Sequence, residues 1–225
     1  MAGTGLWLTV HPAYVDWRSS ERPSMFWLHG FMGTGKSCLA HAMIEDIKPC
    51  IISSTDTRKL AYFYCDGASV QGASEIAKSE NILRCLLQQL SRVGCECRLM
   101  AAVIATYRTT HLEGSLSKKQ CMSPRNLINE SERTIFVIDC LDECSEVVQL
   151  NLVKELTWLL GNCTSPLSIF VSSRQNRFID NLFTGYDLTE IDTTENNSTD
   201  VATFVTTTAK RSRLESGASY VVSRW

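Results

Sequence analysis

The chain has 225 residues, of which 44% are hydrophobic and 20% are charged, and its formal net charge is -2. This composition excludes a collagen-like chain, a coiled-coil rod and a mostly disordered chain, because each needs a glycine, heptad or low-hydrophobicity bias that is missing here. The near-neutral charge gives no global attraction to nucleic acid or to an anionic membrane, so we expect neither as a partner.

The cysteines and the N-terminus indicate a reducing compartment. The ten cysteines are scattered along a chain that is too long for a small disulfide-stapled scaffold, so most are expected to be reduced thiols. Cys140 and Cys144 lack a second pair at metal-ligand spacing, which favours structural thiols over a zinc site. The N-terminus lacks a basic segment followed by an apolar run, so no secretory signal is expected and the cytoplasm is favoured.

Apolar periodicity predicts strands that alternate with helices. In the first half of the chain it predicts an amphipathic lead-in helix at 6–17, a strand at 25–29, a helix at 37–47 ending before Pro49, a strand at 60–65 and a helix at about 80–93. In the second half it predicts a helix at 101–107, a polar loop at 114–125, strands at 134–138, 167–171 and 186–191, a helix at about 146–160 and a last helix capped by Asp200. Strands separated by helix-length segments are typical of parallel βαβ units, so we expect an α/β fold with helices on both faces of an open sheet.

The segment GFMGTGKS at residues 30–37 matches the phosphate-loop spacing G-x-x-x-x-G-K-[ST], between an expected strand and an expected helix. Glycines let such a loop curl until several backbone N–H groups point at phosphate oxygens, and the helix N-terminus adds its own. Lys36 is expected to contact the terminal phosphates, and the Ser37 hydroxyl to ligate Mg²⁺. The cofactor-binding residues predicted here are Gly30, Gly33, Thr34, Gly35, Lys36, Ser37 and Cys38. The alternative, a glycine-rich turn with an exposed lysine, is disfavoured because the match recurs by chance on the order of once in a hundred such chains.

Three carboxylates follow the strand at 134–138, and open α/β sheets bind ligands at that end of their strands. Asp139 is expected to hold Mg²⁺ directly or through water, because this ion prefers oxygen ligands. Asp142 or Glu143 could orient or deprotonate the attacking water, and the spacing does not say which. An acidic turn that caps the next helix is the alternative.

Arg174 follows the strand at 167–171 and could reach a γ-phosphate, because a guanidinium group matches phosphate oxygens in bidentate fashion. A plain surface arginine fits the sequence equally well. Ser172 and Ser173, beside it, could contact water or phosphate instead.

Several blocks together resemble the NACHT family of signal-transducing P-loop NTPases, in the STAND class, and most of all the nephrocystin-3-like N-terminal domains of fungal multidomain receptors. The blocks are GTGLWL, FWLHGFMGTGKSCLA, LAYFYCD, ENILRCLLQQL, TIFVIDCLDEC and SIFVSSR, in the family's order. The resemblance implies a three-layer αβα sandwich with sheet order 5-1-4-3-2, bound ATP or ADP, and Arg174 as the first sensor. The family usually has Thr where Ser172 stands.

The resemblance also implies a domain plan, with a lead-in helix at 1–24, a NACHT-like nucleotide-binding domain at 25–210 and a truncated tail at 211–225. Family members continue into helical lid domains, which are expected to be missing here, so hydrolysis is expected to be weak. The leading interpretation is a nucleotide-dependent switch of a signalling protein that binds Mg-ATP and either self-associates or binds other proteins. The alternatives are a scaffold that binds nucleotide without hydrolysing it and, with less support, a small-molecule kinase. No guanine-reading Asn-Lys-x-Asp motif occurs, which favours ATP over GTP.

Overall fold

A computed structural model describes residues 5–51, 58–66, 75–93, 98–99 and 124–196. The expected helix at 101–107, most of the loop at 114–125, the helix capped by Asp200 and the tail at 211–225 lie outside the described residues. The described part contains no helix that is both long and apolar enough to cross a membrane.

The centre of the fold is one sheet of five parallel strands. In chain order these are β1 (Ser24–His29), β2 (Lys59–Tyr64), β5 (Thr134–Asp139), β6 (Leu167–Ser173) and β7 (Leu188–Asp192). They lie side by side in the order β2-β5-β6-β1-β7. Counted by the sheet's own strands, this order is 2-3-4-1-5, which is the expected order 5-1-4-3-2 read from the opposite edge.

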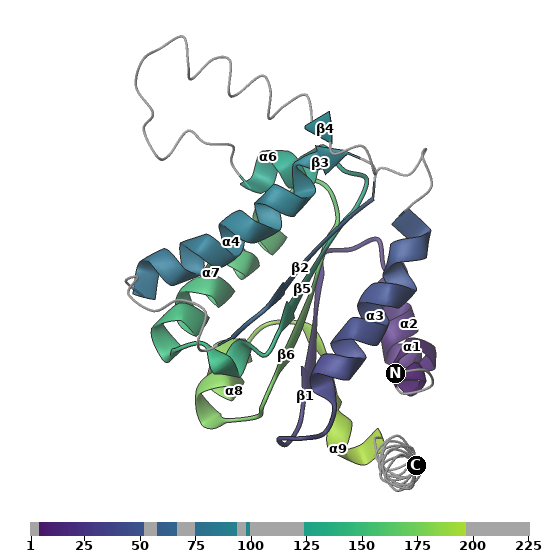
Figure 1. Cartoon of the computed structure of the whole chain (residues 1–225), viewed down its shortest axis with the longest axis vertical. Coiled ribbons are helices and arrows are strands. Elements are labelled where there is room, and N and C mark those ends of the chain that lie inside the picture. The colour runs from purple at the N-terminus through teal and green to yellow at the C-terminus, as the bar shows by residue number, and fades with distance from the viewer. Residues whose placement is uncertain (1–4, 52–57, 67–74, 94–97, 100–123, 197–225) are drawn as a thin grey trace, which may run out of the picture.

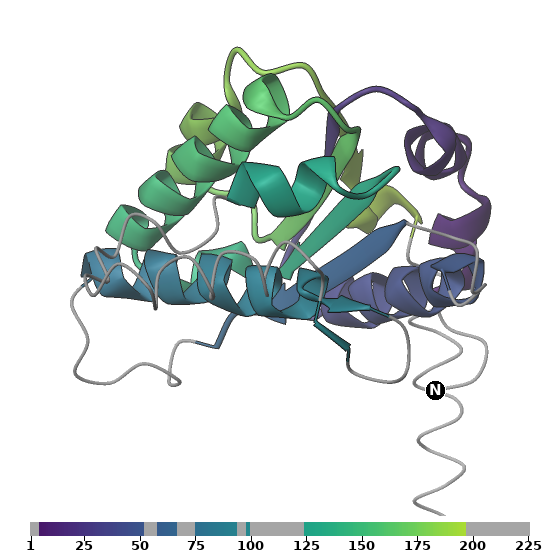
Figure 2. The ribbon, with the colours of Figure 1, turned by 90° about the horizontal axis from the view of Figure 1, so that it is seen from above.

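Helices cover both faces of the sheet and complete the expected three-layer αβα sandwich (Figures 1 and 2). One face carries α1 (Leu6–Val10), α2 (Pro12–Ser19) and α3 (Lys36–Ile51). The other carries α4 (Glu75–Leu90), α6 (Pro124–Asn129), α7 (Glu146–Asn162) and α8 (Arg177–Phe183). The remaining elements are short, namely the antiparallel pair β3 (Arg92–Val93) and β4 (Arg98–Leu99), the 3₁₀ turn η1 (Leu141–Glu143) and α9 (Thr193–Asn196).

The three central strands β1, β5 and β6 are buried on both faces, as expected for a parallel sheet between helices. On β1, Met25 and Trp27 enter the core beneath α4 and α7, whereas Phe26 and Leu28 enter the core beneath α3. In the second core the rings of Phe26 and Phe170 stack with their centroids 5.6 Å apart. Because alternate residues enter opposite cores, these strands appear in the sequence as continuous apolar runs.

The lead-in helices belong to this second core. Leu8, Tyr14 and Trp17 are almost fully buried, and the Trp17 ring lies 5.4 Å from that of Phe26. The Tyr14 hydroxyl donates a hydrogen bond of 2.9 Å to Asp46 on α3. Burial and the Asp46 carboxylate together raise the pKa of the Tyr14 hydroxyl. The lead-in is therefore fixed to the sheet by aromatic packing and to α3 by a partly buried polar contact.

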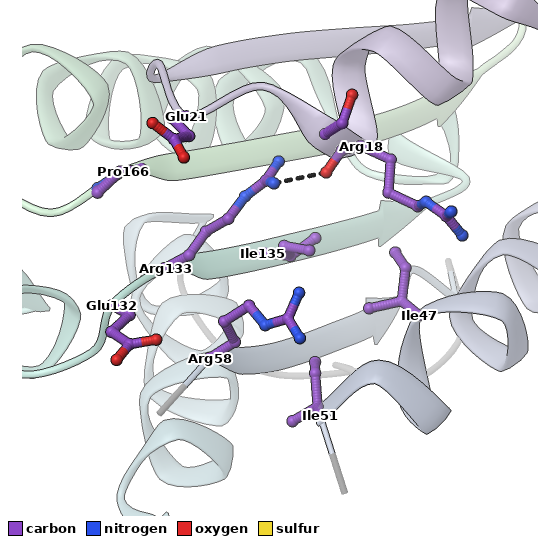
Figure 3. Close-up of a pocket in the computed structure, with 10 residues that line it drawn as sticks. Arg18, Glu21, Ile47, Ile51, Arg58, Glu132, Arg133, Ile135 and Pro166 are labelled. Atoms are coloured by element: carbon purple, nitrogen blue, oxygen red, sulfur yellow. Dashed lines mark hydrogen bonds between the residues drawn. The ribbon is translucent and has the colours of Figure 1, made fainter. Parts of the chain in front are cut away.

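Arg133 holds the end of α2 against the sheet. Its guanidinium donates to the carbonyl oxygens of Trp17, at 3.1 Å, and of Arg18, and to the Ser168 hydroxyl at 2.9 Å. These bonds satisfy carbonyl groups that a helix C-terminus leaves unpaired. A pocket of about 660 Å³ opens beside Arg133 at the amino ends of the strands (Figure 3). Side chains of both charges line it, so its electrostatics select no single class of ligand.

Some elements differ from the sequence expectations. Helix α3 continues through Pro49 to Ile51, because Ile51 packs against the second core and outweighs the hydrogen bond that proline cannot donate. Helix α4 begins at Glu75 and ends at Leu90, since the expected last turn belongs to the β3–β4 pair. The lead-in is two helices rather than one, and α6 and α8 were not expected at all.

Candidate nucleotide-binding site

The glycine-rich segment forms the connection from β1 to α3. Helical hydrogen bonding begins at its end, where the Leu39 amide donates to the Gly35 carbonyl oxygen at 3.0 Å. Gly33 and Gly35 both have φ near 80°, in the left-handed region that side chains with a β-carbon rarely adopt. The loop therefore has the backbone conformation for which its glycines are needed.

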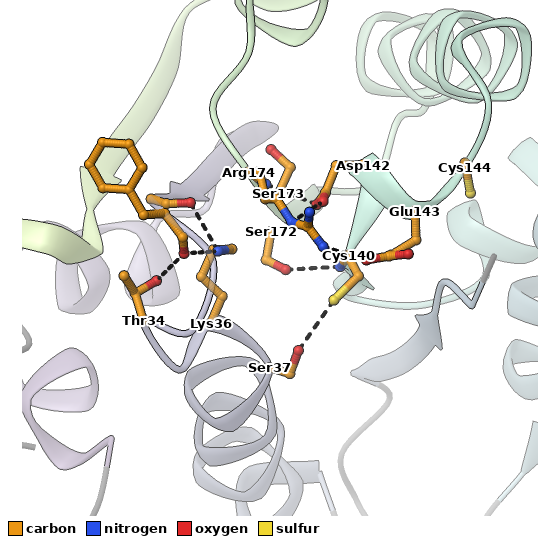
Figure 4. A network of polar contacts seen from close by, with 12 residues as sticks. Thr34, Lys36, Ser37, Cys140, Asp142, Glu143, Cys144, Ser172, Ser173 and Arg174 are labelled. Atoms are coloured by element: carbon orange, nitrogen blue, oxygen red, sulfur yellow. Dashed lines mark hydrogen bonds and ion pairs between the residues drawn. The ribbon is translucent and has the colours of Figure 1, made fainter. Parts of the chain in front are cut away.

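Lys36 lies beneath this loop and is only 8% exposed. Its ammonium group donates to the carbonyl oxygens of Gly30, at 3.0 Å, and Phe31, at 2.8 Å (Figure 4). Burial lowers the pKa of Lys36, and the nearby Asp142 carboxylate opposes that effect. Phosphate oxygens can take the place of these two carbonyls as partners of the ammonium group.

Asp139 ends β5 with its side chain almost fully buried. One of its oxygens accepts a hydrogen bond from the Ser172 hydroxyl, which in turn accepts one of 3.0 Å from the Cys140 amide. Ser173 accepts a 2.8 Å hydrogen bond from the Trp27 indole. The expectation that Ser172 and Ser173 contact water or phosphate is wrong, because both side chains are fully buried against protein partners.

Cys140 contacts both expected magnesium ligands, Ser37 and Asp139. Its sulfur lies 3.2 Å from the Ser37 hydroxyl oxygen and 3.4 Å from Oδ2 of Asp139. Its φ of 58° places it in the left-handed region, and burial raises the pKa of its thiol to about 11. Ser37 and Asp139 therefore both contact the Cys140 sulfur, and their hydroxyl and carboxylate oxygens are of the kind that Mg²⁺ prefers as ligands.

Arg174 connects the two candidate catalytic carboxylates. Its Nε lies 3.0 Å from Oδ2 of Asp142, and its Nη2 lies 2.9 Å from Oε1 of Glu143. The Arg174 amide also donates to Oδ1 of Asp142 at 2.9 Å. The Asp142 side chain is 9% exposed and that of Glu143 is 42% exposed. Asp142 is thus the less accessible carboxylate, held against Arg174, and Glu143 is the more accessible one.

The fold brings the predicted site residues to one end of the sheet. Figure 4 shows Lys36 and Ser37 facing the group formed by Cys140, Ser172 and Arg174. Cys38 follows Ser37 with its side chain exposed on α3. Sequence reasoning missed the sulfur between Ser37 and Asp139, although the position of Cys140 directly after a strand-end aspartate was visible. It also missed Thr193, whose hydroxyl contacts that of Thr34 from 159 positions further along the chain.

A family model described as "Nephrocystin 3, N-terminal" matches residues 3–174. The chain belongs to the nephrocystin 3 N-terminal family. This finding confirms the NACHT-type resemblance drawn from the motifs. Family membership and the phosphate loop together support a nucleotide-binding module.

Known proteins resemble this member of the nephrocystin 3 N-terminal family over part of their length. The vegetative incompatibility protein HET-E-1 of Podospora anserina is 26% identical over 180 residues, which are 75% of this chain and 12% of that protein. Among solved structures, Drosophila ORC bound to DNA has a TM-score of 0.46 at 14% identity, covering 83% of this chain and 40% of that one. The ORC1 protein of Aeropyrum pernix in complex with DNA has a TM-score of 0.45 at 14% identity, with 83% and 48% covered.

Proposed function

We propose that this chain is a Mg-ATP-binding switch module of a signalling protein, with weak hydrolysis that returns the switch to its ADP state. The observation that carries the proposal is the approach of Ser37 to Asp139 through Cys140, beside the buried Lys36. A phosphate loop and an acidic strand end meet there, which is the arrangement that P-loop NTPases use. The HET-E-1 relative is a vegetative incompatibility protein, which supports a role in signalling through protein partners or self-association.

The loop amides and Lys36 bind the β- and γ-phosphates in this proposal. Ser37 and Asp139 hold Mg²⁺, which, when bound, neutralises negative charge on the phosphates. Ser172 donates to Oδ1 of Asp139 and the Cys140 thiol lies against Oδ2, so Oδ2 would hold the ion in place of that thiol. The site residues Gly30, Gly33, Gly35 and Cys38 contribute backbone N–H groups rather than side chains.

The geometry also supports different roles for the two acidic candidates in this proposal. Asp142 accepts a hydrogen bond from the Arg174 amide, forms an ion pair with its Nε and is nearly buried, so it positions that arginine. Glu143 accepts only one bond from Arg174 among the described contacts and is more exposed, so it orients the attacking water. Arg174 exchanges its bond to Glu143 for a γ-phosphate oxygen when ATP is bound.

Titration with fluorescent ATP and GTP analogues, with and without Mg²⁺, tests this proposal. We expect binding that depends on Mg²⁺, favours ATP and weakens at least tenfold in the Lys36→Ala variant, which loses a charged phosphate contact. Lys48→Ala is the matched control, because it removes an exposed lysine from the same helix. Unchanged affinity in Lys36→Ala contradicts the proposal.

A non-hydrolysing nucleotide-binding scaffold is the second candidate, and the Arg174 contacts favour it. They engage both carboxylates that could activate water. Steady phosphate release that disappears in a Glu143→Gln variant supports the switch, whereas nucleotide binding with background release supports the scaffold.

A further inference from the structure

Thr193 lies where the last strand meets the phosphate loop. It is the first residue of α9, and its side chain is fully buried. Its hydroxyl oxygen lies 3.0 Å from the carbonyl oxygen of His29 and 2.8 Å from the hydroxyl oxygen of Thr34. The parallel register of β1 and β7 pairs His29 with Asp192, and this brings Thr193 to the start of the loop. Figure 1 shows α9 at the same end of the sheet as the first turn of α3.

Thr193 also occupies space next to the first glycine of the loop. A β-carbon added at Gly30 would lie 2.0 Å from the Thr193 hydroxyl oxygen and 3.3 Å from its β-carbon. The first of these distances is far shorter than a van der Waals contact. The backbone of Gly30 and the side chain of Thr193 are therefore packed directly against each other.

The two threonine hydroxyls carry two protons but take part in three contacts among the described residues. Thr34 donates to the Phe31 carbonyl oxygen at 2.9 Å, while Thr193 faces both Thr34 and the His29 carbonyl. Each hydroxyl has a single proton to donate. When Thr193 donates to Thr34, the Thr34 hydroxyl continues to donate to the Phe31 carbonyl oxygen. When Thr193 instead donates to the His29 carbonyl oxygen, Thr34 has to be the donor in the hydrogen bond between the two threonines. Thr34 then no longer donates to the Phe31 carbonyl oxygen.

This choice matters because Lys36 shares the same acceptor. The Phe31 carbonyl oxygen accepts from both Thr34 and the Lys36 ammonium group, at 2.8 Å for the latter (Figure 4). Lys36 has to leave this carbonyl in order to reach a phosphate. The Thr34 hydroxyl keeps the Phe31 carbonyl paired within the protein while Lys36 is away. Thr193 favours that state whenever it donates to Thr34.

We infer that Thr193 is a positioning residue for the phosphate loop, which orients Thr34 and couples phosphate binding to β7 and α9. Only the second half of this inference, the coupling of phosphate binding to β7 and α9, rests on the proposed nucleotide binding. The first half, that Thr193 fixes the loop, holds or fails without any nucleotide. Because α9 begins at Thr193, a change in the loop is transmitted directly to the element that follows the sheet.

Hydrogen exchange of the full chain without nucleotide tests the first half. Thr193→Val removes the hydroxyl but keeps the shape, and Thr193→Ser keeps the hydroxyl. Thr189→Val is the matched control, because it makes the same change four residues earlier, on β7. We expect faster exchange in a peptide covering residues 29–37 for Thr193→Val alone. Equal exchange in the two valine variants, or equally fast exchange in Thr193→Ser and Thr193→Val, overturns the inference.

Nucleotide binding tests the second half. We expect Thr193→Val to bind a fluorescent ATP analogue about tenfold more weakly than wild type, while Thr193→Ser and Thr189→Val bind like wild type. In wild type, the nucleotide is expected to slow exchange in residues 188–196, and this effect is expected to be lost in Thr193→Val. Nucleotide binding by wild type without slower exchange at 188–196 overturns the coupling. Failure of wild type to bind any nucleotide contradicts the proposed function instead, and leaves the exchange result at residues 29–37 to decide the role of Thr193.

Discussion

Arg174 contacts both carboxylate oxygens of Asp142, because its side-chain Nε lies 3.0 Å from Oδ2 and its backbone amide donates to Oδ1 at 2.9 Å. The same guanidinium reaches Glu143 with Nη2 at 2.9 Å. The end of β6 is thereby tied to the acidic turn after β5. The proposed hydrolysis requires one of these contacts to loosen, and we expect it to be the one to Glu143, whose side chain is 42% exposed.

Glu143→Gln and Asp142→Asn are expected to affect the protein differently. Glu143→Gln should lower phosphate release to background without changing the melting temperature, because the side chain is 42% exposed. Asp142→Asn should lower the free energy of unfolding by about 1 kcal/mol, because it breaks a partly buried contact to Arg174. Phosphate release and thermal unfolding of both variants check this, and a stability loss in Glu143→Gln alone would reverse the assignment.

Ser172→Ala is expected to weaken magnesium binding. It removes the hydroxyl that holds one Asp139 oxygen and accepts from the Cys140 amide. Ser173→Ala is the matched control, because it also removes a fully buried hydroxyl, from the Trp27 indole. Both should lose about 1–3 kcal/mol of stability, but only Ser172→Ala should reduce the gain in nucleotide affinity on adding Mg²⁺. Ser172→Thr, which keeps the hydroxyl, should preserve that gain.

The raised pKa of Tyr14 leads us to expect a loss of stability at high pH. Burial and Asp46 raise its pKa in the folded protein above the ordinary value of 10.0. Below pH 10 the stabilisation is fully present, and above pH 10 the unfolded chain loses this proton first, so stability falls as pH rises. Urea unfolding at pH 7 and pH 10.5 should show a smaller drop for Tyr14→Phe than for wild type. At pH 7 that variant should be about 1 kcal/mol less stable, whereas the exposed Tyr186→Phe should match wild type.

Arg133→Met is expected to loosen α2. The methionine fills much of the same space but leaves the carbonyls of Trp17 and Arg18 and the Ser168 hydroxyl without this donor. We expect a loss of about 2 kcal/mol in urea unfolding and faster hydrogen exchange in α2. Arg125→Met, on the exposed side of α6, should change neither. Unaltered exchange in α2 would show that aromatic packing alone holds it.

The sequence predicted the parts of the site that depend on local pattern. Lys36 and Ser37 follow an apolar run and open a helix, and Asp139 ends the clearest strand, so all three could be located from spacing alone. Parallel strands then place these ends together. The five-strand order also followed, although only through the family resemblance.

Contacts between distant side chains could not be predicted in this way. No spacing rule indicates that Arg174 would pair with Asp142, 32 residues earlier, or that Ser172 would bond to Asp139 rather than to water. Helix α8 was missed although Asn176 caps it by accepting from the Ile179 amide at 2.8 Å, which is a recognisable signal. The end of α3 was misjudged because tertiary packing of Ile51 decided it, not the local effect of Pro49.

The burial of Leu8, Tyr14 and Trp17 sets the minimum length of an independently folding fragment. A shortened protein that started at β1 would expose the stacked rings of Phe26 and Phe170 to water. Such a truncation is expected to aggregate on expression even though every residue of the phosphate loop is retained. Recombinant work on this protein therefore has to retain Leu8, Tyr14 and Trp17, however peripheral that segment looks beside the nucleotide motifs.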